Sequence, residues 1–478
     1  MNVDDLSWQA RTLGGVPPSV VRTLLDQGQV EHLVRAARER GDWHCAEGAV
    51  RGLCAEGEFE RALALLEPFA EIGWRPAEWL TAEVMIQQGA GGEALALVRP
   101  DQARRGDGHA CARYAELAVK AGQVDVAIEI LAPHLGESWL LSKLVDLTEG
   151  QNRDEQVLDL LDQALEGAAG DWCRGGLGRW EVLIGTARVL ERAGRGGEAV
   201  DLMRAELGRN RQLPLNFPEH YANLLARQGR IEELAELAAR EPHVVPRYTQ
   251  ALEETGRAPE AEALLRGRIA AHDGANDRVA LMHLLARQGR IDEAVETGRP
   301  TYDYYDCWNQ IHWALELLAA DGRPGQALAL LESLTGAWAE GHPDTVRHLR
   351  LWLLGEDGRC ADGIAEATAL GAQEPDEWDT ALAALLERDG RPDAAAALLR
   401  SSAHRRAPFE LADLLARHGR PAEALAAVPS IAEERASTAR REREQERARE
   451  AAERRQQVGP GEGEDGISAE PPPLDLLQ

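Results

Sequence analysis

The residues that could support catalysis or bind a metal are scattered along the chain and do not fall into known spacings. The six cysteines are Cys45, Cys54, Cys111, Cys173, Cys307 and Cys360. None forms a paired CxxC spacing, so they are typical of small buried hydrophobic residues or free thiols. No HExxH, GxSxG or Walker motif occurs. We therefore expect no enzyme activity, no metal and no cofactor.

The glycines between Gly167 and Gly178 form one cluster that could hold a phosphate. Glycine-rich loops bind phosphate through backbone N–H groups when a strand precedes them and a lysine follows. Neither feature is present here, so an ordinary loop or a change of superhelix direction is the better interpretation. An enzyme with an unrecognised site in this loop is the least favoured alternative.

Repeated helices must position any site in this chain. The segment from Leu284 to Ala294 is nearly copied from Leu224 to Leu234, and its central glycine recurs in fainter copies. The interval averages about 33 residues, which is typical of stacked helical hairpins. The turn glycines are Gly28, Gly57, Gly89, Gly122, Gly150, Gly194, Gly229, Gly256, Gly289, Gly322, Gly358, Gly390 and Gly419.

The residues around each glycine predict two packed helices. Most units have Leu four residues before the glycine and Ala five residues after it, as at Leu285 and Ala294. A large residue facing a small one lets two helices approach closely. The glycine supplies the positive φ that ends the first helix, and an acid such as Asp292 complements the start of the second.

This pattern resembles the tetratricopeptide repeat family over roughly residues 15 to 428. The shared features are the period, the central glycine and the Gly-x-x-x-Glu-Ala sequence at Gly289 to Ala294. The resemblance implies an all-α, right-handed superhelical solenoid of stacked antiparallel hairpins. The Gly150 unit departs from the pattern, with Asp146 and Glu155 in place of Leu and Ala, so a more general α-solenoid is the alternative.

The resemblance also implies where a partner would bind. In the family, residues thirteen, ten and six before the turn glycine tend to point into the concave groove. The groove expected from this register contains His44, Arg51, Trp79, Glu83, Glu219, Asn223, Asn276, His283, Asn309, His312, Glu316, His348 and Trp352. The alternative is that these are simply exposed polar positions. We expect no metal site among them, because ligands must lie within about 2 Å of one ion and adjacent hairpins are farther apart. Trp308 and Trp313 are expected to pack between hairpins.

The net charge and the hydropathy of the chain limit which binding partners and which cellular location we expect. The formal charge of −28 opposes attraction to nucleic acid and to anionic membranes. No apolar run approaches the ~20 residues that cross a bilayer, and no signal-peptide pattern begins the chain. We expect a soluble cytoplasmic protein, in a reducing compartment, that binds no nucleic acid and no membrane.

The C-terminal segments differ in composition from the repeats. We predict a solenoid over 1–430 that is irregular near 151–186, a charged Arg/Glu-rich helix over 431–458 and a disordered acidic, Pro-rich tail over 459–478. The expected function is a protein-binding or peptide-binding scaffold that uses the groove of a single extended solenoid and prefers a basic segment. The alternative is a regulator whose superhelix closes when a peptide binds.

Overall fold

The computed structural model describes residues 2–12, 14–101, 104–167, 177–209, 213–214, 216–272, 274–299, 308–334, 341–374 and 376–457. The predicted tail over 459–478 and most of the glycine cluster lie outside these residues. The described part is built from α-helices joined in consecutive hairpins, which confirms the all-α repeat fold.

Each turn glycine follows the first helix of a hairpin. These first helices are α2 (Pro18–Asp26), α4 (Trp43–Ala55), α6 (Arg75–Gln87), α8 (Gly108–Lys120), α10 (Ser138–Leu147), α12 (Arg179–Arg192), α14 (Asn216–Arg227), α16 (Val245–Glu254), α18 (Ala275–Arg287), α20 (Trp308–Ala320), α23 (Pro343–Glu356), α25 (Asp379–Arg388) and α27 (Ala407–Arg417). They occur where the repeat pattern predicts them.

The second helices follow each turn. They are α3 (Val30–Arg40), α5 (Phe59–Glu71), α7 (Gly91–Val98), α9 (Val124–Leu131), α11 (Asp154–Gly167), α13 (Gly196–Arg209), α15 (Ile231–Arg240), α17 (Ala258–His272), α19 (Ile291–Thr297), α21 (Pro324–Ser333), α24 (Cys360–Gly371), α26 (Pro392–Ser401) and α28 (Pro421–Ala427). Helix α1 (Val3–Thr12) precedes the first hairpin, α29 (Ile431–Gln457) follows the last, and short 3₁₀ turns occur at Ala132–His134 and Pro242–Val244.

The turn at Gly289 shows why glycine recurs. Its φ is 75°, in the left-handed region that L-residues with a Cβ rarely adopt. The backbone N–H of Arg290 donates to the Leu285 carbonyl at 2.9 Å, and the N–H of Gly289 donates to the Ala286 carbonyl at 2.9 Å. These bonds satisfy carbonyls that the end of α18 would otherwise leave unpaired. The predicted glycine turn is confirmed, and Gly150, in the least typical unit, has a φ of 71° as well.

The core confirms the predicted pairing of large and small residues. Leu285 of α18 and Ala294 of α19 are both 0% exposed. The alanine five residues after the glycine is fully buried wherever it occurs: Ala62, Ala94, Ala127, Ala199, Ala261, Ala294, Ala327, Ala395 and Ala424. Since a methyl group fills each of these sites, a longer side chain there would push the two helices apart.

Arginines link each hairpin to the one before it. Arg290, directly after a turn glycine, places one Nη 2.6 Å from Glu262 of α17 and the other 2.6 Å from Glu293 of its own helix. Arg420 makes the equivalent pairs with Asp393 and Glu423. These exposed ion pairs add modestly to stability, but they fix the offset between neighbouring hairpins.

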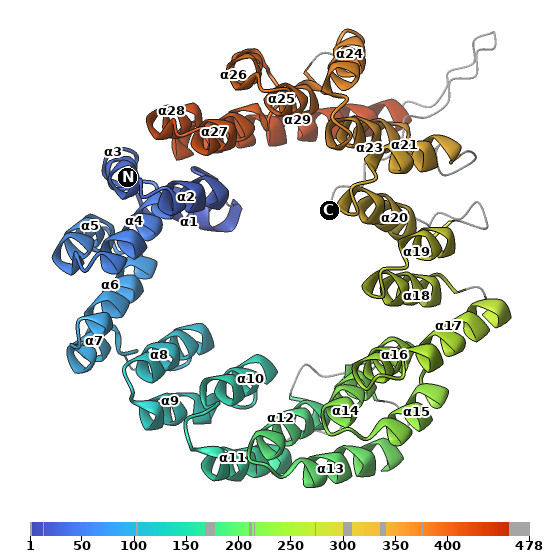
Figure 1. The fold of residues 1–478 in the computed structure, drawn as a ribbon. Helices are drawn as coiled ribbons and strands as arrows, with labels where there is room; N and C mark the ends of the chain where they lie inside the picture. Colours follow the sequence, from blue (N-terminus) through green and yellow to red (C-terminus); the bar gives the residue numbers. More distant parts are fainter. Residues whose placement is uncertain are drawn as a thin grey trace.

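The hairpins curve into a ring (Figure 1). Figure 1 shows first helices such as α10, α12, α14 and α20 on the inner side of the ring and second helices such as α11, α13 and α17 on the outer side. First helices of neighbouring hairpins also pack directly on one another, as α10 does on α12 and α23 on α25. From α6 to α20 each first helix therefore contacts the next, and we call the inner side of the ring the inner face.

The two ends of the array meet, which corrects the expectation of an extended solenoid. Helix α2 packs on α27, α3 on α28 and α1 on α29 (Figure 1). One buried apolar cluster joins residues of both ends, among them Leu24, Val34, Leu415 and Val428. We call this contact between α1–α3 and α27–α29 the clasp. The terminal hairpins bury apolar side chains on each other, as neighbouring hairpins of the array do.

The C-terminal helix begins at the clasp. Helix α29, which the sequence predicts as a charged helix, runs from Ile431 to Gln457. Near its start, the carboxylate of Glu434 accepts a hydrogen bond from the N–H of Gly15 at 2.9 Å. Arg435 pairs with Asp5 of α1 at 2.9 Å. In the described part of the chain, no helix combines the length and the apolar character needed to cross a membrane.

Candidate functional site

The inner face contains a cavity of about 530 Å³ between α20, α23 and α25. Four residues predicted for the groove line it: His312, Glu316, His348 and Trp352. They come from two successive first helices, at the positions ten and six before the turn glycine. The structure therefore brings these side chains of α20 and α23 around one space, which we call the aromatic cavity.

The aromatic cavity has an apolar floor and a polar rim. Leu349, Leu351 and Leu385 line it and are buried. At the rim, Nδ1 of His312 lies 3.5 Å from Oε1 of Glu316. Apolar walls with a few placed polar groups are typical of sites that hold a side chain or a small ligand, and this volume falls in their usual range.

Hydrogen bonds hold Trp352 at the edge of the aromatic cavity. Its indole N–H donates to Oε1 of Glu356 at 2.9 Å, and Arg388 of α25 places Nη2 2.6 Å from the same oxygen. The hydrogen bond from Arg388 lowers the pKa of Glu356 and burial opposes it, so the carboxylate stays charged near neutral pH. Trp352 thus keeps one orientation without contributions from a partner.

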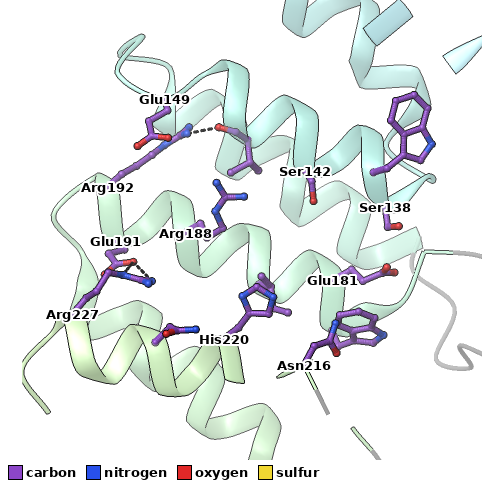
Figure 2. A pocket seen from close by; sticks show the side chains of 15 residues that line it. Ser138, Ser142, Glu149, Glu181, Arg188, Glu191, Arg192, Asn216, His220 and Arg227 are labelled. Atoms are coloured by element: carbon purple, nitrogen blue, oxygen red, sulfur yellow. Dashed lines mark hydrogen bonds and ion pairs between the residues drawn. The ribbon is translucent and has the colours of Figure 1, made fainter. Parts of the chain in front are cut away.

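A second cavity of about 650 Å³ lies on the inner face between α10, α12 and α14 (Figure 2). Asn223, from the predicted groove, lines it together with Ser142 and Trp139, whose ring is 37% exposed. Figure 2 shows Arg188 and His220 in its central part, with Arg192 and Arg227 nearer one end. We call it the arginine cavity.

Glu191 of the arginine cavity is already paired. Glu191 accepts from Arg227 at 2.7 Å and from Gln228 at 3.1 Å. Burial raises the pKa of Glu191, but these hydrogen bonds outweigh it and the net pKa is lowered. Arg192 is held by Asp154 at 2.8 Å and by the Val145 carbonyl at 2.5 Å. The charged groups at this end of the cavity therefore form a fixed frame.

The centre of the arginine cavity has polar groups with fewer partners. Among the residues that the structure describes, Arg188 contacts one acid, Asp146, at 2.6 Å. Burial first, and then the charges of Arg188 and Arg227, lower the pKa of His220, so its ring is neutral near pH 7. A neutral imidazole offers one N–H donor and one acceptor, which suits hydrogen bonding to a polypeptide backbone.

The groove prediction omitted the first helix of the Gly194 unit, and the structure places six of its residues at the arginine cavity, three of them at the register positions. Glu181, Ile184 and Arg188 lie thirteen, ten and six residues before Gly194. They fit the same register as Asn223 before Gly229. Applying that register to every unit would have found them, whereas His220 and Ser142 fall outside it and give no such signal.

Three histidines of the first helices stack on a tryptophan of the next hairpin. The ring centroids are 4.6 Å apart for His109 and Trp139, 3.4 Å for His283 and Trp313, and 4.4 Å for His348 and Trp378. Each pair is separated by 30 residues in the sequence, close to one repeat. Trp313 does pack between hairpins as predicted. Packing between hairpins thus gives a structural role to His283 and His348, two of the histidines predicted for the groove.

Four of the predicted groove residues are committed to contacts within the protein. Nδ1 of His44 lies 3.0 Å from the Val16 carbonyl oxygen, which ties α4 to the chain before α2. Arg51 pairs with Glu47 at 2.5 Å. The remaining two also have partners: Arg75 stacks over Trp79 at 5.9 Å, and Glu83 pairs with Arg113 at 2.6 Å and Lys120 at 3.0 Å. These residues make contacts within the first third of the ring.

Two other residues predicted for the groove are exposed, and the side chain of a third lies outside the described residues. Glu219 and Asn276 are exposed on α14 and α18. The side chain of Asn309, on α20, lies outside the described residues, as does that of Trp308. The structure therefore concentrates the predicted groove in two places, with Asn223 at the arginine cavity and the four residues around the aromatic cavity.

No chemistry of cysteine or metal is indicated by the side chains that the structure describes. Cys45, Cys111 and Cys360 are buried and Cys54 is half-buried. Burial raises the pKa of the Cys45 and Cys111 thiols, which disfavours the reactive thiolate. Across the described ranges, no three His, Cys, Asp or Glu side chains come together as ligands of one ion would.

Comparisons with known proteins add only fold-level similarity. No protein-family model and no curated protein sequence matches the chain. A chain of the Naa15/Naa10 complex bound to HypK-THB is 14% identical with a TM-score of 0.36, over 84% of this chain and 68% of that one. The pentatricopeptide repeat protein PPR10 from maize is 16% identical with a TM-score of 0.32, over 85% of this chain and 62% of that one. A chain of the APC/C hetero-tetramer Cut9–Hcn1 is 13% identical with a TM-score of 0.23, over 85% and 90%.

Similarities of this size do not show which partner this chain binds or what superhelix it forms. Its own helices define the class to which it belongs. The protein is an α-helical repeat protein whose hairpins form a ring closed by the clasp, with two cavities on the inner face.

Proposed function

We propose that this protein is a non-catalytic scaffold that holds a polypeptide segment of a partner on its inner face. The proposal rests on one observation above the others. Two cavities, of about 530 and about 650 Å³, open on first helices at positions that the repeat register assigns to the groove. Other first helices join them in one surface, which suits a ligand that is long rather than compact.

The two cavities would contact the segment in different ways. In the aromatic cavity, Trp352 and the apolar floor would take an apolar or aromatic side chain, and fixed aromatic rings commonly dominate such contacts. In the arginine cavity, Asn223, Ser142 and His220 would form hydrogen bonds with the backbone of the segment. Both contacts are available to an extended chain that crosses several hairpins.

We further propose that the bound segment is basic. The chain has a formal charge of −28, which draws positive segments toward it and raises their rate of encounter. The arginine cavity itself contains Arg188, Arg192 and Arg227, so the preference would come from the field of the whole ring. This predicts binding that weakens as salt is added.

The test is capture of partners from the cell of origin, identified by mass spectrometry, with wild-type protein and a double variant. The double variant is His312→Ala with Trp352→Ala, and it removes two walls of the aromatic cavity. We expect it to lose the partners that the wild type captures while the helical circular dichroism signal stays the same. Both residues are partly exposed, so their loss leaves the buried core intact.

A matched control removes an apolar side chain from the outer side of the ring. Leu97 of α7 is 57% exposed, and Leu97→Ala should capture the same partners as the wild type. An unchanged set of partners with the inner-face double variant, or a loss with Leu97→Ala, would count against an inner-face site.

The clasp favours a second candidate, a ligand-responsive regulator. The alternative drawn from the sequence is a regulator whose superhelix closes when a peptide binds. In this structure, however, the two ends already meet. A regulator built on this ring would therefore respond by opening. Small-angle scattering with and without a captured partner would show a larger radius of gyration, and an unchanged radius would contradict it.

A further inference from the structure

The clasp is the one junction of the ring that no peptide bond spans. Every other pair of neighbouring hairpins is joined by the chain itself, so parting them still leaves a closed loop of polypeptide. Parting α2 and α3 from α27 and α28 opens the loop. A segment with a folded domain at each end that is too large to pass the opening of the ring reaches the inner face only if the clasp opens.

Polar contacts hold much of the clasp. Nη2 of Arg40, at the end of α3, donates to the carbonyls of Val428 at 2.6 Å and Pro429 at 2.9 Å, and Nη1 donates to the Leu425 carbonyl. These carbonyls lie at and just beyond the end of α28, where no helical N–H remains to pair with them. A single guanidinium therefore satisfies the end of the last repeat helix from the other end of the chain.

Further polar contacts cross the clasp beside those of Glu434 with Gly15 and of Arg435 with Asp5. Nε2 of Gln27 donates to the Ala416 carbonyl at 2.9 Å, and the Ser19 hydroxyl lies 3.3 Å from Oδ2 of Asp413. Groups of this kind regain hydrogen bonds to water when they part, so the net cost of breaking each is small.

The clasp is also incompletely packed. A cavity of about 270 Å³ lies between α3 and α28, lined by His32, Ala36 and Arg40 on one side and by Ala422 and Leu425 on the other. A gap at an interface forgoes contacts that a filled interior would make, so this part of the clasp adds little to its stability. Gaps of this kind also occur at other junctions, such as the cavity of about 440 Å³ between α17, α18 and α19, so what sets the clasp apart is that no peptide bond spans it.

We infer that the clasp is a gate, and that it opens to admit a polypeptide sideways onto the inner face. The inference rests on the proposed function, since it describes how the segment arrives there. It requires the ends to part and rejoin while the hairpins stay folded. Arg40 is the main latch, because its loss leaves the end of α28 without partners and removes no apolar core residue.

The first experiment measures the gate without any partner. Hydrogen exchange of full-length Arg40→Gln is expected to be at least about tenfold faster than wild type in α2, α3, α27 and α28, and unchanged in α12 to α18. Arg204→Gln is the matched control, since the Arg204 guanidinium is likewise held by several partners, here the acids Asp201 and Glu233, but lies on α13 at the outer side of the ring. Equal exchange in Arg40→Gln and wild type, or faster exchange throughout the chain, would overturn the latch.

The second experiment locks the gate. Ser19→Cys with Asp413→Cys places two thiols where the native side-chain oxygens lie 3.3 Å apart, and each single substitution serves as the control. Formation of the disulfide is first verified by peptide mapping. The probe is an unfolded basic, leucine-containing segment of about 30 residues, long enough to span roughly 100 Å when extended. One version has free ends, and the other has a folded ubiquitin at each end.

The locked ring should bind the free-ended probe like wild type but capture the blocked probe at least about tenfold more slowly, and a reductant should restore capture. Equal capture of the blocked probe by locked and reduced protein would overturn the gate and leave the proposed function standing. If neither form binds the free-ended probe, the fault lies with the proposed basic-segment function. The hydrogen-exchange comparison then still decides whether the clasp opens.

Discussion

Arg287 at the end of α18 forms a two-point salt bridge with Glu253 of α16, with Nη2 2.6 Å and Nε 2.9 Å from the same carboxylate oxygen. Arg227 pairs with Glu191 and Arg417 with Glu387 in the same way. All three arginines lie two residues before a turn glycine. They belong to the most repeated segment of the chain, so that segment serves the joints between hairpins and leaves partner choice to the residues that vary.

The Arg287 pair should contribute little to stability by itself. Arg287→Ala is expected to lower the free energy of unfolding by about 0.5 kcal/mol, because the arginine side chain is half exposed and solvent screens the pair. Urea unfolding at low and high salt measures this. The difference between variant and wild type should shrink in high salt, and a loss of several kcal/mol would show that the pair is not a simple surface bridge.

The alanine face of the second helices should not tolerate a larger residue. Ala261→Leu on α17 is expected to destabilise the protein by about 1–3 kcal/mol, because Ala261 is fully buried against its neighbours. Ala263 lies on the same helix and is exposed, so Ala263→Leu should change stability by less than about 0.5 kcal/mol. Equal effects at the two positions in thermal unfolding would refute the packing account.

The turn glycines and the helical glycines should respond in opposite directions. Gly289→Ala is expected to cost about 1–2 kcal/mol, because φ is 75° there, although an added methyl group would meet no other atom within 4 Å. Gly267 lies inside α17 with open space around it, so Gly267→Ala should stabilise by about 0.5–1 kcal/mol. Chemical denaturation of the two variants tests both signs, and a neutral result at Gly289 would mean that the turn relaxes.

The fold could be predicted because its signals are local. Leu285, Gly289 and Ala294 report on two helices and one turn within a dozen residues, and the same pattern repeats in most units. The Gly150 unit is helical on both sides although Asp146 and Glu155 replace the usual Leu and Ala, since the positive-φ turn and the packing of α11 on α12 remain.

Ring closure could not be predicted in the same way. The contact of Arg40 with Val428 joins residues 388 positions apart, and it depends on the sum of small rotations at every joint.

The candidate site was only partly predictable. The repeat register located Trp352 and Asn223, but which cavities form depends on side chains such as His220 and Leu385 that lie outside that register.

The histidine stacked on Trp313 should titrate below the ordinary histidine value. Burial first, and then the charge of Arg287, lower the pKa of His283, so folded protein should show it below about 6.5 by NMR. Its contribution to stability is complete above that pH and is lost as the pH falls through the folded pKa. Arg287→Gln should move the pKa of His283 upward, and no movement would show that burial alone sets it.

The most direct test of the inner-face site is hydrogen exchange of full-length protein with and without the free-ended basic probe. The account predicts slower exchange in the first helices that line the two cavities, α10, α12, α14, α20, α23 and α25, and unchanged exchange in the outer helices α11, α13, α15, α21 and α24. Protection confined to the outer helices, or none at saturating probe, would contradict it.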